Sequence, residues 1–176
     1  MANFVFIATS IDGYIAKKDG DISWLESISN PEKVDFGYAD FMERIDAIVM
    51  GRHTFEKVML FDAWPYAKKV FVLSSTLNHA PQKLLDKVEI INAKPIELIK
   101  HLRKLGMSNL YIDGGKTIHS FLKLKLIDEM IISTLPVVLG DGIPLFGKQD
   151  YPIEFEHLET IAYKGGLVQT RYRKII

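Results

Sequence analysis

Short apolar runs alternate with helical patterns along the chain, and this alternation predicts an α/β fold. Runs rich in β-branched and aromatic residues predict strands over 3–9, 46–50, 69–73, 87–91, 109–112, 127–137, 153–162 and 167–175. Helices are expected over about 31–44, 54–59 and 95–105, and from about 116 through Leu122. The helix at 95–105 has the clearest pattern, because Pro95 begins it, Gly106 follows it and its apolar side chains share one face.

The order of these segments predicts how the strands pair. Strands joined by helices pair in parallel, whereas the last two strand candidates have no helix between them. A turn at Lys164-Gly165-Gly166 would join those two as an antiparallel hairpin. We therefore expect one domain over residues 1–176, with a mostly parallel central sheet of about eight strands and flanking helices.

Composition narrows the classes of function. The 22 basic residues balance the 22 acidic ones, so no overall field favours nucleic acid or an anionic membrane as a partner. The absence of cysteine excludes disulfides and thiolate catalysis, and the five histidines show no metal-ligand spacing, so no metal is expected. The apolar stretch from Phe4 to Ala8 is too short for a signal peptide, which predicts a cytoplasmic protein.

Two strand–glycine–helix junctions carry the main chemical signal. The first reads D-A-I-V-M-G-R-H-T-F-E over 46–56, and the second reads N-L-Y-I-D-G-G-K-T-I over 109–118. A glycine at such a break lets backbone approach a ligand, the new helix offers free N–H groups, and Arg52 adds a planar cation. Neither junction matches G-x-G-x-x-G or G-x-x-x-x-G-K-[ST]. Together the two junctions predict a dinucleotide site.

The long connection after the first strand is the second candidate for chemistry. It reads S-I-D-G-Y-I-A-K-K-D-G-D-I-S-W over 10–24, with turn signals at Asp12-Gly13 and Asp19-Gly20. The apolar residues within it are unusual for an exposed loop and are typical of a segment that covers a pocket. A plain surface loop is the alternative.

The motifs, taken in order, resemble those of the dihydrofolate reductase superfamily. They are A-T-S-x-D-G-x-I-A-x-x-x-G-x-x-x-W, I-V-M-G-R-H-T-F-E, V-F-V-L-S-S-T, Y-I-D-G-G-K-T-I and L-P-V-V-L-G-D-G-I-P-L-F-G. The S-x-D-G loop and the L-G-D-G-x-P-L-F segment are similar to the pyrimidine reductase domain of riboflavin biosynthesis. This resemblance spans nearly the whole chain and implies a dihydrofolate reductase-like fold.

The resemblance implies NADPH as the cofactor. Ala8 and Ile15 match positions beside the nicotinamide, and Arg52 matches a position near the 2′-phosphate of the adenosine ribose. The residues that match cofactor-binding positions are Ala8, Ile15, Gly51, Arg52, Thr54, Leu73, Ser74, Ser75, Ile112, Gly114, Gly115, Lys116, Thr117 and Ile118.

Two carboxylates are candidates for catalysis. Counting back from Gly51 places Asp35 where dihydrofolate reductases hold their active-site acid, although it also reads as an exposed helix carboxylate. Asp12 matches an Asp-Gly beside the nicotinamide in the pyrimidine reductase branch, although a turn explains it as well. Ser10 and Trp24 are expected at the substrate, with a loop anchor as the alternative for Trp24.

The resemblance therefore implies a reductase that transfers a hydride from NADPH to a C=N bond of a small heterocyclic substrate. The expected activity is similar to that of 5-amino-6-(5-phosphoribosylamino)uracil reductase. A dihydrofolate reductase, a reductase of another small metabolite and a non-catalytic NADPH-binding regulatory protein are the alternatives. A homodimer is expected, with no nucleic-acid or membrane partner.

Overall fold

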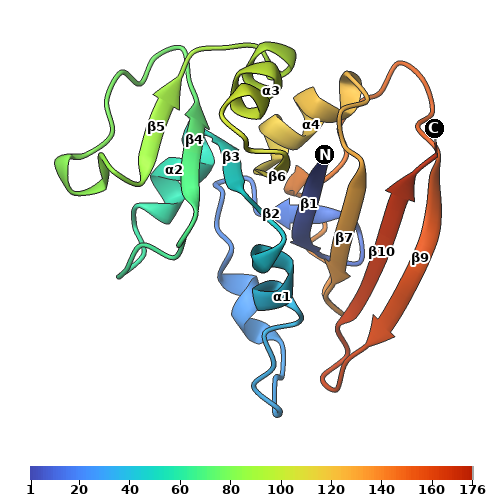
Figure 1. The fold of residues 1–176 in the computed structure, drawn as a ribbon. Coiled ribbons are helices and arrows are strands. Elements are labelled where there is room, and N and C mark those ends of the chain that lie inside the picture. The colour runs from blue at the N-terminus through green and yellow to red at the C-terminus, as the bar shows by residue number, and fades with distance from the viewer. Residues whose placement is uncertain (176) are drawn as a thin grey trace.

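A single eight-stranded sheet runs through the computed structural model, which describes residues 1–175 (Figure 1). Its order is β5 (Val88–Ile91), β4 (Lys69–Leu73), β3 (Ala47–Gly51), β6 (Asn109–Asp113), β1 (Ala2–Thr9), β7 (Glu129–Thr134), β10 (Val168–Lys174) and β9 (Phe155–Ala162). The strands from β5 to β7 are parallel, and β10 is antiparallel to both of its neighbours. The predicted mostly parallel sheet with an antiparallel C-terminal hairpin is confirmed.

Helices cover both faces of the sheet. On one face, α3 (Pro95–Lys104) and α4 (Gly115–Lys123) bury Leu102 and Phe121 against the strands. On the other face, α1 (Tyr38–Glu43) and α2 (Arg52–Val58) bury Phe41 and Phe55. Successive strand residues point to opposite faces, so each central strand contributes side chains to both cores. Burying a side chain of this size stabilises the fold by about 1.5–3 kcal/mol.

The first helix is much shorter than predicted, because α1 occupies only the end of the 31–44 segment. The Asn30 side chain accepts a hydrogen bond from the Val34 N–H and donates one to the Val34 carbonyl, which closes a loop in place of a helical turn. Lys33, Phe36 and Gly37 then take positive φ angles of 49°, 57° and 78°, which no right-handed helix contains.

The connection after β1 contains structure that the sequence pattern did not indicate. Its β2 (Tyr14–Ala16) pairs antiparallel with β8 (Ile143–Pro144), and it also contains the 3-10 turn η1 (Ser23–Ser27). A second 3-10 turn, η2 (Gln82–Leu84), lies between β4 and β5. Strands of two and three residues are too short for a detectable period. The predicted strand 127–137 is also shorter, since β7 ends at Thr134 before Pro136.

The parallel strands place their carboxyl ends along one edge of the sheet. Both β3 and β6 lead at this edge into the helices α2 and α4, and β3 lies directly beside β6. Ligands of open α/β sheets bind at such an edge. The candidate site is therefore built from residues at these strand ends.

Candidate functional site

The two glycine junctions predicted from the sequence interlock in space. A Cβ atom on Gly114 would lie 2.1 Å from Oγ1 of Thr54, and a Cβ atom on Gly51 would lie 2.9 Å from Oγ1 of Thr117. A threonine near the start of each helix thus packs against the glycine of the other junction. Gly114 also has a φ of +87°, which L side chains rarely adopt. The first turns of α2 and α4 therefore lie side by side, in close contact at the two glycines.

Arg52 lies at the start of α2 and reaches the loop that follows β4. Its Nη1 donates to Oγ1 of Thr76 at 2.8 Å, and its Nε donates to Glu56 at 2.6 Å. Ser74 Oγ accepts hydrogen bonds from the backbone N–H groups of Thr76 and Leu77. The structure thus brings Arg52 and Ser74 together through Thr76, the last residue of the V-F-V-L-S-S-T motif, for which no role was predicted.

Some predicted cofactor residues are placed to support the site and not to touch a ligand with their side chains. Ile112 and Ile118 are fully buried in the core, and Thr117 is buried against Gly51. Ser75 and Lys116 are exposed, while Leu73 is half-buried at the end of β4. All of these residues lie at or next to the strand ends, and their roles stay predictions.

Ile15 lies over the second junction. A Cβ atom on Gly115 would lie 3.0 Å from Cδ1 of Ile15 and 3.3 Å from Cγ2 of Ile143. These two isoleucines come from β2 and β8, so the small two-stranded sheet covers the start of α4. The loop predicted to cover the nicotinamide does reach the predicted cofactor wall.

A cavity of about 370 Å³, which we call the apolar pocket, lies beside this edge on the α1 face of the sheet. Its lining is mostly apolar, and the polar groups in it come from Asp35, Tyr38 and Ser133. The complete lining is Phe6, Ala8, Leu25, Ile28, Asp35, Phe36, Tyr38, Ser133, Leu135 and Leu167. The predicted nicotinamide neighbour Ala8 and the predicted acid Asp35 therefore share one pocket.

The two residues predicted at the substrate, Ser10 and Trp24, are not part of the lining of this pocket. Trp24 is buried against Leu135 and Leu167, and its indole N–H has no hydrogen-bond partner within residues 1–175. Ser10 is buried, and its hydroxyl bonds both backbone groups of Tyr14. Both residues support the loop, and their contact with substrate stays a prediction.

Asp35 stands before α1 and is held by backbone. Its carboxylate accepts hydrogen bonds from the N–H groups of Gly37 at 3.0 Å and Ala39 at 2.8 Å. The Ala39 bond, followed by the Gly37 bond, lowers the pKa of Asp35 below its usual value. Asp35 is thus kept ionised at the pocket wall and suits the binding of a positive or proton-donating ring edge.

Asp12 fastens two loops together. It accepts hydrogen bonds from the backbone N–H groups of Leu139 at 3.1 Å and Gly140 at 2.7 Å, which belong to the L-G-D-G segment. A hydrogen bond from Ser10, and then these backbone bonds, hold the pKa of Asp12 below its usual value. The arrangement favours an ionised clamp over a proton donor.

Asp113 is the carboxyl group with the opposite behaviour, and it lies in the Y-I-D-G-G-K-T-I motif without a predicted catalytic or binding role. Asp113 is the last residue of β6. Its Oδ1 accepts a hydrogen bond from the Gly114 N–H at 2.8 Å, and its Oδ2 accepts a long one from the Tyr66 hydroxyl at 3.5 Å. Burial raises the pKa of Asp113 to about 6. Burial, and then the Asp113 charge, raise the pKa of Tyr38 to about 12, so this pocket residue stays protonated. A polar residue closing an apolar run was its only signal in the sequence.

Two further properties concern the chain as a whole. Across residues 1–175, every helix is too short or too polar to cross a membrane. The same residues contain no cluster of three or more histidine, aspartate and glutamate side chains that could share a metal ion.

Three proteins of similar length are similar in sequence to this chain. The uncharacterized protein YwjB of Bacillus subtilis (strain 168) is 39% identical over 145 residues, which cover 81% of this chain and 80% of YwjB. The uncharacterized protein YyaP of the same organism is 31% identical over 180 aligned positions, covering 94% and 91% of the two chains. A solved protein from Shewanella sp. PV-4, with a suggested role in riboflavin biosynthesis, is 48% identical, covers both chains fully and has a TM-score of 0.96.

More distant solved structures share the fold. The Thermotoga maritima deaminase and 5-amino-6-(5-phosphoribosylamino)uracil reductase has a TM-score of 0.72 at 16% identity, over 99% of this chain and 56% of that one. Dihydrofolate reductase from Enterococcus faecalis, complexed with NADP(H), has a TM-score of 0.69 at 17% identity, over 99% and 97% of the chains. The RibD C-terminal domain model matches residues 4–168, and with these motifs and this fold the chain belongs to the RibD C-terminal domain family.

Proposed function

We propose that this protein is an NADPH-dependent reductase that transfers a hydride to a C=N bond of a small heterocyclic substrate. The expected activity is similar to that of 5-amino-6-(5-phosphoribosylamino)uracil reductase. The observation that carries this proposal is the pair of interlocked glycine junctions beside the apolar pocket. A reductase of this kind needs a dinucleotide site next to a ring-sized cavity, and we call the paired junctions at Gly51 and Gly114 the cradle.

The residues at the junctions fit a nicotinamide dinucleotide. Gly51 and Gly114 allow close packing of the two junctions where α2 and α4 begin, and N–H groups at helix starts favour phosphate. The Arg52 guanidinium, whose side chain is 44% exposed, retains donors beyond those it uses on Glu56 and Thr76. We assign this arginine to the 2′-phosphate that distinguishes NADPH from NADH. When bound, the cofactor supplies the hydride.

The carboxyl groups divide the remaining work. We propose that the substrate ring lies in the apolar pocket, where ionised Asp35 orients it. Asp113 is our choice for the proton source, because a pKa of about 6 leaves it partly protonated near neutral pH and it lies near enough for its charge to act on Tyr38 in the pocket lining. Asp12 then acts by holding its loop in place. Direct catalytic roles for Asp12 and Asp35 stay predictions that the variants below distinguish.

A dihydrofolate reductase is the second candidate. The placement of Asp35 in the wall of the apolar pocket favours it, because the resemblance implies a pterin-binding carboxylate there. A regulatory protein would bind NADPH without turnover. The homodimer stays a prediction, supported by the position of β9 at the outer edge of the sheet.

The function is tested by turnover with NADPH against 5-amino-6-(5-phosphoribosylamino)uracil and against dihydrofolate. We expect NADPH oxidation with the aminouracil and little with dihydrofolate, measured from the loss of NADPH absorbance. Turnover of dihydrofolate alone would favour the second candidate. Tight NADPH binding, measured by fluorescence, without turnover of either compound would favour a regulatory role.

Replacing Arg52 tests the cofactor assignment. Charge-assisted hydrogen bonds contribute roughly 1.5–3 kcal/mol, and this side chain is partly exposed, so Arg52→Ala should weaken NADPH binding by about tenfold. NADH has no 2′-phosphate and should change by less than about twofold. Calorimetric titration measures both, with Arg103→Ala on α3 as the matched control. Equal losses for the two cofactors would contradict the assignment.

A further inference from the structure

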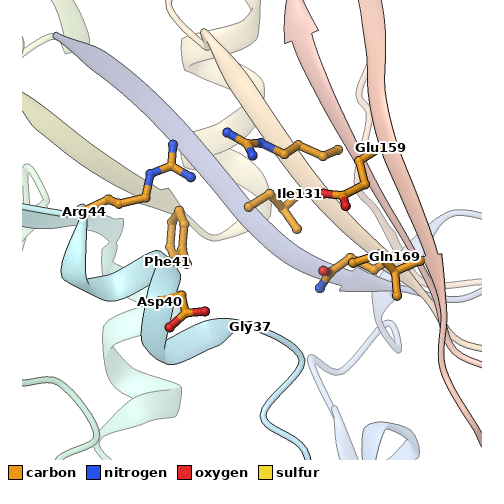
Figure 2. A pocket seen from close by; sticks show the side chains of 9 residues that line it. Gly37, Asp40, Phe41, Arg44, Ile131, Glu159 and Gln169 are labelled. Carbon is orange, nitrogen blue, oxygen red and sulfur yellow. The ribbon is translucent and has the colours of Figure 1, made fainter.

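A second cavity, which we call the polar pocket, adjoins the apolar pocket on the same face of the sheet. It encloses about 200 Å³ between α1 and the strands β7, β10 and β9. Figure 2 shows Phe41 and Arg44 on the α1 side, across from Ile131, Glu159 and Gln169. Its charged lining distinguishes it from the apolar pocket. The proposed hydride transfer uses none of these residues.

The Gln169 side chain links the linings of the two cavities. Gln169 lines the polar pocket, and its Nε2 donates to Ser133 Oγ and to the Phe36 carbonyl, both at 3.0 Å. Ser133 and Phe36 line the apolar pocket. A ligand whose ring occupies the apolar pocket therefore has the polar pocket as the nearest place for a substituent.

Two arginines of the polar pocket are fixed by one buried carboxylate. The Glu129 side chain is only 7% exposed, and its Oε1 accepts hydrogen bonds from Arg171 Nε at 2.7 Å and Arg44 Nη2 at 3.3 Å. Both arginines line the cavity. Because they share one acceptor oxygen, two guanidinium groups are held close together before any ligand arrives.

Further ion pairs extend this arginine cluster. Arg173 Nη2 lies 3.8 Å from the other Glu129 oxygen, and Arg173 Nη1 lies 3.6 Å from Glu156. Three arginines thus meet two glutamates, and Asp40 and Glu159 of the cavity lining bring the number of carboxylates to four. Each guanidinium has five N–H donors in a fork that matches an oxyanion, and Arg44 and Arg171 each use one donor on Glu129.

We propose that the polar pocket is an oxyanion subsite, which holds a phosphate or carboxylate on the tail of the substrate through Arg44 and Arg171. The substrate part of this inference rests on the proposed function. Asp40 and Glu159 also line the cavity and act against an anion, with no ion-pair partner for either within residues 1–175. The proposal therefore predicts opposite effects: neutralising an arginine must weaken oxyanion binding, and neutralising Asp40 or Glu159 must strengthen it.

The test is a titration with inorganic phosphate and, separately, with acetate at constant ionic strength, followed by NMR of the Gln169 side-chain amide. An Arg52→Ala background removes the competing cofactor-phosphate contact. We expect Arg171→Gln to weaken the bound oxyanion by about tenfold and Arg44→Gln by about threefold, whereas Glu159→Gln and Asp40→Asn should tighten it by about twofold. Preference for phosphate over acetate, or the reverse, identifies the tail.

Several outcomes would overturn the subsite. They are no shift of the Gln169 amide, insensitivity to both arginine variants, or weaker binding in Glu159→Gln, which would indicate a cationic ligand. The acidic variants leave Glu129 its partners, so they test the idea even where an arginine variant fails to fold. Arg103→Gln is the control for a general change of charge.

NADPH affinity, measured separately by fluorescence on the protein with Arg52 intact, distinguishes the two proposals. If NADPH binds but phosphate and acetate do not, the subsite is wrong and the reductase stands. If the predicted opposite effects appear without NADPH binding, the proposed reductase is wrong and the oxyanion site stands.

Discussion

Asp113→Asn is expected to lower the turnover number by on the order of 10²-fold or more at neutral pH, as removal of a general acid does. Asparagine keeps the shape of the side chain and its acceptor oxygen for the Gly114 N–H, but it supplies no proton. NADPH affinity should stay within about threefold, because the cradle glycines and Arg52 are untouched. The loss therefore belongs to the chemical step.

The same variant should be more stable than the parent protein above neutral pH. The pKa of Asp113 in the fold is about 6, above its ordinary 3.8, so the folded protein holds this proton more tightly than the unfolded chain does. That stabilisation is complete below pH 3.8 and is lost as the pH rises through 6. The ionised form then costs about 2–3 kcal/mol of unfolding free energy, which asparagine avoids.

Urea unfolding at pH 4 and pH 8 measures this difference. Asp113→Asn should match the parent at pH 4 and exceed it by about 2 kcal/mol at pH 8. Asp12→Asn and Asp35→Asn are matched controls with the opposite sign, because the pKa of each is lowered and their ionised forms stabilise the fold above the ordinary pKa. Full turnover in Asp113→Asn, with a large loss of turnover in Asp12→Asn, would identify Asp12 as the proton donor in place of Asp113.

Gly114→Ala is expected to remove NADPH binding and to destabilise the protein by about 3 kcal/mol or more. A methyl group there would lie 2.1 Å from Oγ1 of Thr54, and the φ of +87° adds backbone strain. Because Thr54 belongs to the other junction, the clash pushes α2 away from α4. The cradle opens at the point where a pyrophosphate would lie.

Two comparisons separate the clash from the strain. Gly106 has a similar φ of +82° with nothing within 4 Å of its missing Cβ, so Gly106→Ala should cost only about 1 kcal/mol. Adding Thr54→Ala to Gly114→Ala removes the oxygen that clashes and should recover part of the stability. Chemical denaturation and NADPH titration follow both effects. A Gly114→Ala protein as stable as Gly106→Ala would refute the interlocked cradle.

The sheet could be predicted from the sequence because its strands are local apolar runs. The helix before Arg44 was misplaced, since the Asn30 side chain competes with helical hydrogen bonds in a way that apolar spacing does not reveal. The glycine junctions were visible as motifs, but their interlocking was not. It depends on contacts between Thr54 and Gly114 that only the parallel order of β3 and β6 creates.

The chemistry of buried charges was hidden for the same reason. Asp113 acquires its raised pKa from burial, which outweighs the lowering effect of hydrogen bonds such as the one from Tyr66, a residue distant in sequence. Glu129 accepts hydrogen bonds from Arg44, which is 85 positions away in the sequence, and from Arg171, which is 42 positions away. A single sequence gives each of these charges the appearance of an ordinary surface residue.

The contacts that hold the loop after β1 determine when this loop becomes ordered. Asp12 ties this loop to Gly140, β2 pairs with β8, and buried Trp24 anchors its far end. Ordering of the loop is thus completed during folding and not at each encounter with a ligand. The entropic cost of ordering it is absent from the binding step, and the wall above Gly115 is preorganised before a nicotinamide ring arrives.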